Sequence, residues 1–127
     1  MLGPVTITLA AVVLDAADLD EESQFWRRLL GGDLVKRERH HLVTVKGSPL
    51  IAVQLAPNHT PPQWPDGRPQ QIHLDLAVDD IGSAHQHAMD AGARLLSQPE
   101  GMDDASASGY RVYADPAGHP FCLCWGG

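Results

Sequence analysis

The chain has 127 residues, of which 43% are hydrophobic and 20% are charged, and this composition is that of an ordinary globular domain. A domain of this length buries roughly two thirds of the surface of its unfolded chain, so it is expected to fold without disulfides. The formal net charge of −7 and the absence of a basic run longer than Arg27-Arg28 argue against nucleic acid or an anionic membrane as a partner.

The first half of the chain predicts a strand, a helix and three further strands. Residues Val5–Leu14 are mostly β-branched or aliphatic and favour a strand; they lack the basic start of a signal peptide and are too few to span a membrane. Asp18 is a typical helix N-cap, helical periodicity follows over Leu19–Leu30, and Gly31 is expected to end the helix. The three further strands are predicted at Asp33–Arg39, His41–Lys46 and Leu50–Ala56.

A proline-rich stretch, Asn58–Pro69, separates this half from a second one with the same order of elements. Its four prolines exclude a regular helix or a central strand. The segments around Asp18-Leu19 and Asp80-Ile81 match when shifted by 62 residues, which indicates an internal duplication. The second half is predicted to contain a strand at Gln71–Val78, a helix at Ile81–Ala91, and strands at Ala93–Leu96, Tyr110–Ala114 and Pro120–Trp125.

The sequence therefore predicts an α+β fold built from two tandem βαβββ modules. Module one covers about 1–57, the linker about 58–69 and module two about 70–127, and together they form a single domain over 1–127. One curved sheet with one helix is too small to close a core by itself. Two packed modules can cover each other and leave a cleft, which is a natural site for a ligand.

Several motifs resemble the glyoxalase-like branch of the vicinal-oxygen-chelate superfamily, to which bleomycin-resistance proteins belong. They are Trp64-Pro65-Asp66, the segment from Pro69 through His73-Leu74-Asp75-Leu76 to Asp79-Asp80, the turn Asp115-Pro116-Ala117-Gly118-His119-Pro120-Phe121 and, in module one, Asp18-Leu19, Phe25-Trp26 and Leu30-Gly31. The resemblance implies a curved mixed sheet around one central cleft with helices packed outside. It also implies a homodimer, with the modules paired within one chain or exchanged between two.

The resemblance also implies four ligand positions, because metal-dependent members of the superfamily place ligands on the first and last strands of each module. These positions correspond to Ala11, Gln54, His73 and Cys122, and only His73 carries a typical ligand. A firmly held zinc needs about four N, S or carboxylate ligands, and a facial-triad iron needs two histidines and a carboxylate. No tightly bound metal or other cofactor is therefore expected, and a divalent metal held by His73 and Cys122 is the alternative.

The side chains that line the predicted pocket follow from strand alternation. His73, Asp75 and Ala77 share one face of their strand, and Ile72, Leu74, Leu76 and Val78 share the other, which is expected to pack on the helix. By the same rule Phe121, Leu123 and Trp125 pack outside, and Ala52, Gln54 and Ala56 face inward. The residues predicted to line the pocket are Ala11, Gln54, His73, Asp75, Cys122, Cys124 and Trp64, the last as a roof or as an anchor of the linker.

His73 is the candidate catalytic residue, as a proton acceptor or a hydrogen-bond anchor, with a purely structural role as the alternative. Cys122 and Cys124 are predicted to be reduced thiols in a cytoplasmic protein, because two residues two apart on a strand lie near the upper distance limit for a disulfide. No cation or helix N-terminus adjoins Cys122, so an inert thiol is expected. Among the other histidines, His40, His41, His85 and His87 are predicted at the surface and His119 in a polar turn, and the sequence indicates no partner for His59 in the linker.

Two functions are consistent with these features. The first is the binding of a small organic molecule in the cleft without a tightly held metal, as in bleomycin-resistance members of the superfamily. The second is an enzyme, either a metal-dependent lyase, isomerase or dioxygenase, or a metal-free enzyme that uses His73 for proton transfer. The fold by itself does not name a substrate.

Overall fold

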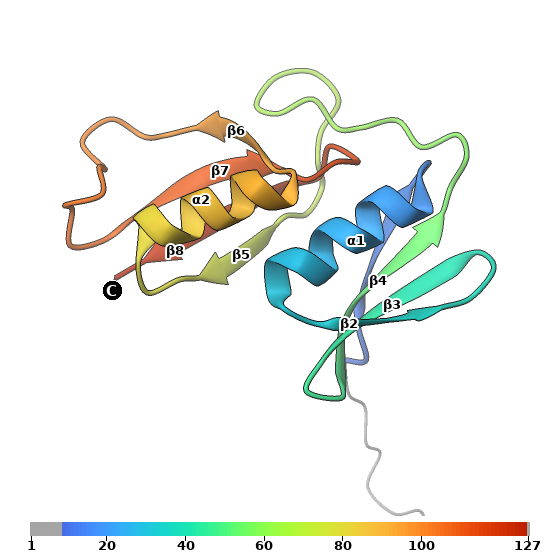
Figure 1. Cartoon of the computed structure of the whole chain (residues 1–127). Helices are drawn as coiled ribbons and strands as arrows, with labels where there is room; N and C mark the ends of the chain where they lie inside the picture. Colours follow the sequence, from blue (N-terminus) through green and yellow to red (C-terminus); the bar gives the residue numbers. More distant parts are fainter. Residues whose placement is uncertain (1–8, 127) are drawn as a thin grey trace, which may run out of the picture.

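The computed structural model describes residues 9–126, which form two βαβββ modules placed side by side with their helices adjacent (Figure 1). The predicted α+β fold is therefore confirmed. Module one contains β1 (Val12–Ala16), α1 (Leu19–Leu30), β2 (Asp33–Lys36), β3 (His40–Val45) and β4 (Ser48–Leu55). Module two contains β5 (Leu74–Ala77), α2 (Ile81–Ala91), β6 (Arg94–Ser97), β7 (Gly109–Ala114) and β8 (Pro120–Trp125).

Both helices have the predicted bounds and begin in the same way. The Asp18 side chain accepts a hydrogen bond from the Glu21 N–H at 3.0 Å, and the Asp80 side chain accepts one from the Ser83 N–H at 3.0 Å. Each cap satisfies a backbone donor that the first turn leaves without a partner. Gly31 ends α1 in the left-handed conformation, with φ at 71°. The equivalent caps, 62 residues apart, support the duplication that the sequence indicated.

Each module folds into a four-stranded mixed sheet with the same topology. Sheet A has the strand order β1-β4-β3-β2, and sheet B has the order β5-β8-β7-β6. In both sheets the first and last strands of the module pair in parallel and the remaining pairs are antiparallel. The parallel pairing places the two strands on which the resemblance puts ligands next to each other, with β1 and β5 at the edges of their sheets.

Among the strands of module one, β1 and β2 differ most from the prediction, and the ends of β3 and β4 differ by one or two residues. β1 runs from Val12 to Ala16 instead of Val5–Leu14, and the part of the predicted strand before residue 9 lies outside the described residues. β2 ends at Lys36 instead of Arg39, because the Arg37 N–H donates to the His40 carbonyl at 2.9 Å and closes a turn. A turn closed by backbone hydrogen bonds is not visible in a periodicity pattern.

The first strand of module two is also shorter than predicted. β5 begins at Leu74 instead of Gln71, because Gln71 adopts a positive φ of 65° that an extended strand does not allow. Ile72 therefore precedes the strand, and its side chain is 63% exposed instead of packing on a helix. The last strand, β8, has the predicted bounds. Its Phe121, Leu123 and Trp125 are buried, and Cys122 and Cys124 are half-buried on the opposite face, as alternation predicts.

One hydrophobic core joins the two modules. Phe25 and Trp26 on α1 meet edge to face, with ring centroids 5.2 Å apart, and both contact Phe121 of β8, at 5.8 and 5.4 Å. Tyr113 of β7 stacks on the other side of Phe121 at 5.5 Å. All four rings are at most 1% exposed, so the modules share apolar surface that neither could bury alone.

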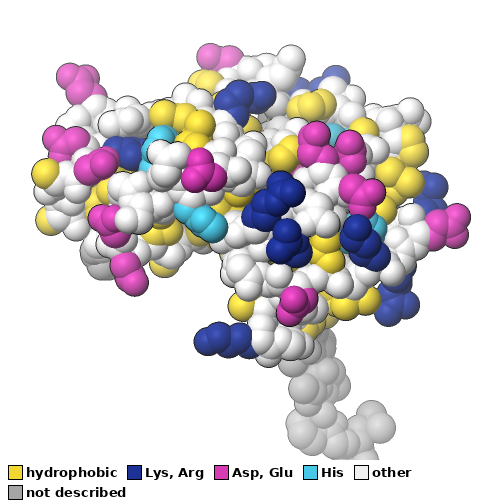
Figure 2. Space-filling model, in the orientation of Figure 1, with side chains coloured by type: hydrophobic (Ala, Val, Ile, Leu, Met, Phe, Trp, Pro, Cys, Tyr) yellow, Lys and Arg dark blue, Asp and Glu magenta, His cyan; other side chains and the backbone are white. Residues whose placement is uncertain are grey.

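The face that carries the helices presents acidic and basic side chains interspersed, without a large region of one sign (Figure 2). Within the described residues, no helix is long and apolar enough to cross a membrane. The linker between β4 and β5 contains no helix or strand and passes over the junction of the two modules (Figure 1).

Candidate functional site

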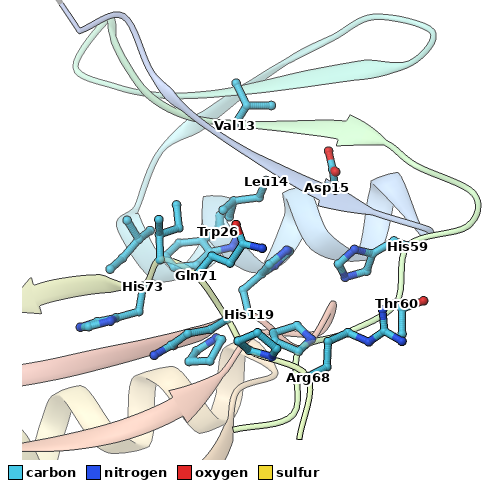
Figure 3. Close-up of a pocket in the computed structure, with 16 residues that line it drawn as sticks. Val13, Leu14, Asp15, Trp26, His59, Thr60, Arg68, Gln71, His73 and His119 are labelled. Atoms are coloured by element: carbon cyan, nitrogen blue, oxygen red, sulfur yellow. The ribbon is translucent and has the colours of Figure 1, made fainter. Parts of the chain in front are cut away.

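A cleft of about 450 Å³ lies between the modules. The linker supplies one wall, β1 and Trp26 of α1 supply another, and the residues that enter β5 and β8 supply the third (Figure 3). Its size falls within the usual range for pockets that hold small organic molecules. The polar lining residues include His59, Thr60, Arg68, Gln70, Gln71, His73 and His119, and the apolar ones include Leu14, Trp26, Ile72 and Leu74.

A shallower hollow of about 430 Å³ lies on sheet B, on the face turned away from α2. It is lined by His73, Asp75, Cys122 and Cys124, together with Tyr110 and residues at the end of β8. The His73 Nε2 lies 3.3 Å from Asp75 Oδ1, so these two side chains do contact each other. His73 lines both the hollow and the cleft, and it therefore stands where the two spaces meet.

The two thiols of the hollow are protonated at neutral pH. Burial, and then the nearby carboxylate of Asp75, raise the pKa of Cys122 to about 11. Burial and Asp75 also raise the pKa of Cys124. Both cysteines are free. A thiol with a raised pKa is a poor nucleophile, and this environment agrees with the inert thiol that the sequence predicts.

The structure brings together four of the seven predicted pocket residues: His73, Asp75, Cys122 and Cys124. Gln54 is exposed on β4, next to Asp15 of β1, and Ala11 precedes β1, so both belong to sheet A. Trp64 is half-buried in the linker. None of these three lines the cleft or the hollow; from the strands of sheet A, only Val13, Leu14 and Asp15 of β1 line the cleft.

A buried triad of Glu22, Asp115 and His119 connects α1 with the turn between β7 and β8. His119 Nδ1 lies 3.0 Å from Glu22 Oε2 and 3.0 Å from Asp115 Oδ2, and the Glu22 and Asp115 side chains are 1% and 0% exposed. The Trp26 indole N–H donates to Asp115 Oδ2 at 3.0 Å, and the Ala117 N–H donates to Glu22 Oε1 at 3.0 Å. The triad thus ties the two modules together with hydrogen bonds next to their shared aromatic core.

Burial and the contacts among the three side chains determine which members of the triad are protonated. Burial raises the pKa of Glu22 to about 8, so this carboxyl is neutral at pH 7 and hydrogen-bonds to Asp115. Burial opposes ionisation of Asp115, but hydrogen bonds from His119 and Glu22 outweigh it and lower its pKa. Burial likewise opposes the charge on His119, and the two carboxyl groups overcome it and raise its pKa to about 10. At neutral pH the triad therefore holds an imidazolium, a carboxylate and a carboxylic acid.

His119 and His59 place this cluster at the edge of the cleft. Both residues line the cleft, and their rings are 5.1 Å apart. His59 also hydrogen-bonds the Ala117 carbonyl at 3.0 Å, a partner that the sequence does not indicate. His119 lies in the predicted turn, and its contacts with two buried carboxyl groups give that turn a role in joining the modules.

Two other histidines are less exposed than predicted. His41 is 5% exposed and lies 2.7 Å from the Ser23 hydroxyl, because β3 turns it toward α1. His85 is half-buried and lies 2.7 Å from the Tyr113 hydroxyl. Burial lowers the pKa of His41. His87 is exposed and His40 is half-buried, on the face of sheet A opposite to His41.

Sequence reasoning missed the triad and Arg68. Glu22 belongs to no motif in the sequence, Asp115 stands only in the family-like turn, and His119 is predicted only as a polar residue of that turn. A signal was present, since Glu22 precedes Phe25 and Trp26 by three and four residues and therefore shares their side of the helix. Nothing in the sequence pairs this face with a turn more than 90 residues later.

Two groups of described residues have metal-ligating atoms within 4.8 Å of one another: His73, Asp75 and Cys122, and the triad. The triad hydrogen-bonds internally and to Trp26, so its ligand atoms are already occupied. The first group supplies three donors of mixed type, which fits an open site completed by water but not a closed structural zinc site. A metal there would have to displace the proton of the Cys122 thiol.

A family model described as a glyoxalase-like domain matches residues 11–124. A fosfomycin resistance protein, FosX, from Listeria monocytogenes has a similar structure, with a TM-score of 0.70, 13% identity, and coverage of 97% of this chain and 96% of the other. A glyoxalase/bleomycin resistance protein from Albidiferax ferrireducens T118 has a TM-score of 0.64 and 16% identity, with coverage of 92% of this chain and 97% of the other. A glyoxalase/bleomycin resistance protein/dioxygenase family enzyme from Burkholderia phytofirmans PsJN has a TM-score of 0.68 and 16% identity, with coverage of 91% of this chain and 96% of the other. No curated protein sequence matches the chain.

Proposed function

Because the chain belongs to the glyoxalase-like domain family, we propose that it binds a small organic molecule beside His73 without a tightly held metal. The observation that carries this proposal is the position of His73 between the cleft and the hollow on sheet B. A ligand there would contact an imidazole that can donate or accept a hydrogen bond, next to apolar walls. Asp75, Cys122 and Cys124 complete the polar side of this site.

The donor set supports a metal-free ligand site more than a metal centre. Of the four positions where metal-dependent relatives place ligands, Ala11 offers none and Gln54 offers only a neutral amide. The thiol of Cys122 is protonated at neutral pH, since burial and Asp75 raise its pKa to about 11. Deprotonating it would cost part of the binding free energy of any metal.

Thermal-shift screening of metabolites, followed by isothermal titration calorimetry of the hits, tests the proposal. A ligand that binds only the folded state raises the midpoint of unfolding with its concentration. His73→Ala should weaken binding by up to about tenfold, which is the loss expected for one hydrogen bond. His87→Ala is the matched control, because His87 is an exposed histidine on α2 that does not line the cleft. Equal affinity in the two variants would contradict the proposed site.

Fosfomycin is a reasonable member of the first screen, because a protein named for resistance to it shares the fold. At 13% identity this likeness concerns the fold alone, and the fold hosts unrelated chemistries. Binding of fosfomycin that His73→Ala does not weaken would place that compound outside the proposed site.

A divalent metal at His73, Asp75 and Cys122 is the second candidate, favoured by the proximity of their three ligand atoms. Such a site would provide a Lewis acid for a lyase, isomerase or dioxygenase reaction. Elemental analysis of protein purified without chelators tests it directly. One metal per chain, lost in His73→Ala and in Cys122→Ser, would replace the metal-free proposal. Metal at well below one equivalent would leave the metal-free site in place.

We also propose a homodimer in which sheet A of one subunit covers sheet B of its partner. On sheet A, the face turned away from α1 exposes Val13, Val35 and Leu50 by 43–48%, and monomers rarely leave large apolar patches uncovered. This pairing would bring Gln54 toward the hollow of the partner subunit and complete the predicted pocket. Light scattering should give twice the mass of the chain, and Leu50→Lys should give the monomer; a monomeric wild type would contradict the proposal. The cytoplasmic location stays a prediction.

A further inference from the structure

The linker presents an unpaired cation to the cleft. Arg68 lines the cleft, and its side chain forms no ion pair with any of residues 9–126. Its backbone is fixed on both sides, because the Gln63 N–H donates to the Arg68 carbonyl at 2.7 Å and the Arg68 N–H donates to Gln63 Oε1 at 2.9 Å. The guanidinium therefore extends from an ordered turn, and its five N–H donors are available to a ligand.

His119 presents a second cation to the same cleft. The two carboxyl groups of the triad hold its Nδ1, which leaves Nε2 as the free nitrogen of the ring. Neither Glu22 nor Asp115 lines the cleft, and both are buried behind the imidazole. A ligand in the cleft would thus meet the N–H of an imidazolium while the balancing carboxylate stays on the far side of the ring.

The other polar residues that line the cleft do not neutralise the positive charge of Arg68 and His119. Asp15 is the one carboxylate among the lining residues. It is in register with Gln54, on the face of β1 opposite to Leu14, so its side chain points away from Trp26 and the floor of the cleft (Figure 3). Gln70 Oε1 is buried and has no hydrogen-bond partner in the described part of the chain, which leaves an acceptor ready for a donor on a ligand.

We propose that the cleft binds small organic acids that carry a hydroxyl or N–H group near the carboxylate. Arg68 and His119 hold the carboxylate, Gln70 accepts the neighbouring donor, and Leu14, Ile72 and Leu74 contact the apolar remainder. The inference rests on the proposed small-molecule site and names the class of its ligand. Charge-assisted hydrogen bonds to a carboxylate are about twice as strong as neutral ones, so the acid should be clearly preferred over a neutral analogue.

Calorimetry with 2-hydroxy-4-methylpentanoate and its uncharged amide tests the proposal on the full-length protein. The two probes have nearly the same shape, so a difference in affinity reports the charge. The acid should bind at least about tenfold more tightly than the amide, and Arg68→Gln should remove that preference. Arg68 is exposed, so the variant should fold normally. Arg94→Gln removes the same charge from an exposed position outside the cleft and should keep the preference.

The outcomes separate this inference from the proposed function. Equal binding of acid and amide, both weakened by His73→Ala, would overturn the organic-acid inference and leave the small-molecule site standing. Preference for the acid that persists in Arg68→Gln would also overturn it. Failure of both probes, and of matched acid and amide pairs across the metabolite screen, would overturn both the inference and the proposed function. Asp15→Asn should leave the acid's affinity unchanged or tighten it, since it removes the one opposing charge.

Discussion

Replacing Glu22 by glutamine tests how the buried triad holds its protons. Burial raises the pKa of Glu22 to about 8, so at pH 6 the folded protein keeps a neutral carboxyl there while the unfolded chain, with a value of 4.5, is ionised. Glutamine reproduces the neutral form. Its carbonyl oxygen can accept from the Ala117 N–H, and its amide can donate to Asp115 as the protonated carboxyl does.

The size of the effect follows from proton linkage. A group whose folded pKa is raised contributes stability that is fully present below its unfolded pKa and is lost as pH rises toward its folded pKa. For Glu22 this window runs from 4.5 to about 8. The wild type should lose about 1.4 kcal/mol of stability per pH unit within the window relative to Glu22→Gln. The two proteins should have similar stability near pH 5, and the variant should be the more stable at pH 8.

Urea denaturation followed by tryptophan fluorescence from pH 5 to pH 9 measures this difference, because Trp26 lies within the cluster. His119 is protonated in the folded and unfolded states of both proteins below its unfolded value of 6.5, so the difference in slope between pH 5 and that value reports Glu22 alone. If Glu22 were instead ionised and paired with His119, Glu22→Gln would leave an unpaired buried charge. It would then be less stable by about 3–5 kcal/mol at every pH above 5, which would refute the assignment.

Three further predictions concern the core, the turn and the thiols. Phe121→Ala should lower the free energy of unfolding by about 3–5 kcal/mol, measured by urea denaturation, because this buried ring joins the modules; a loss below about 1 kcal/mol would show that the core collapses around the gap. Gly118→Ala should lower the free energy of unfolding by about 1–3 kcal/mol in the same assay, because Gly118 has a φ of 92° and an added Cβ would meet Pro61. An unchanged midpoint of urea denaturation would contradict this prediction. In Cys124→Ser, alkylation of Cys122 by iodoacetamide should be slow at pH 8 and rise steeply toward pH 11, and rapid alkylation at pH 7 would show a lowered thiol pKa.

The sequence predicts the fold well because its signals are local. Asp18 and Asp80 cap helices whose apolar faces are fixed by periodicity, and the repeat fixes the topology of the second module once the first is known. The errors occur where backbone hydrogen bonds or dihedral angles decide the outcome. The positive φ of Gln71, which shortens β5, leaves no mark in a pattern of apolar residues.

The candidate site is less predictable, because it depends on how the modules pack. Alternation along the chain correctly groups His73 with Asp75 and Cys122, since Asp75 and Cys122 are paired on neighbouring strands of one sheet and His73 directly precedes β5. It cannot indicate that Gln54, on the other sheet, lines neither space within the chain. The burial of Glu22 is also beyond local pattern, because a glutamate in the first turn of a helix is ordinarily solvated.

The aromatic contacts of Phe121 with Phe25 and Trp26 have a consequence for how the duplicated halves depend on each other. A polypeptide cut within the proline-rich linker would leave two fragments, each with an exposed half of that aromatic cluster and with part of the triad unpaired. Neither fragment should fold alone, yet co-expressed fragments should reassemble, because their recognition surface is already the native core. Each half is thus expected to depend on the other for its core, and tryptophan fluorescence would report the reassembly of such a split protein.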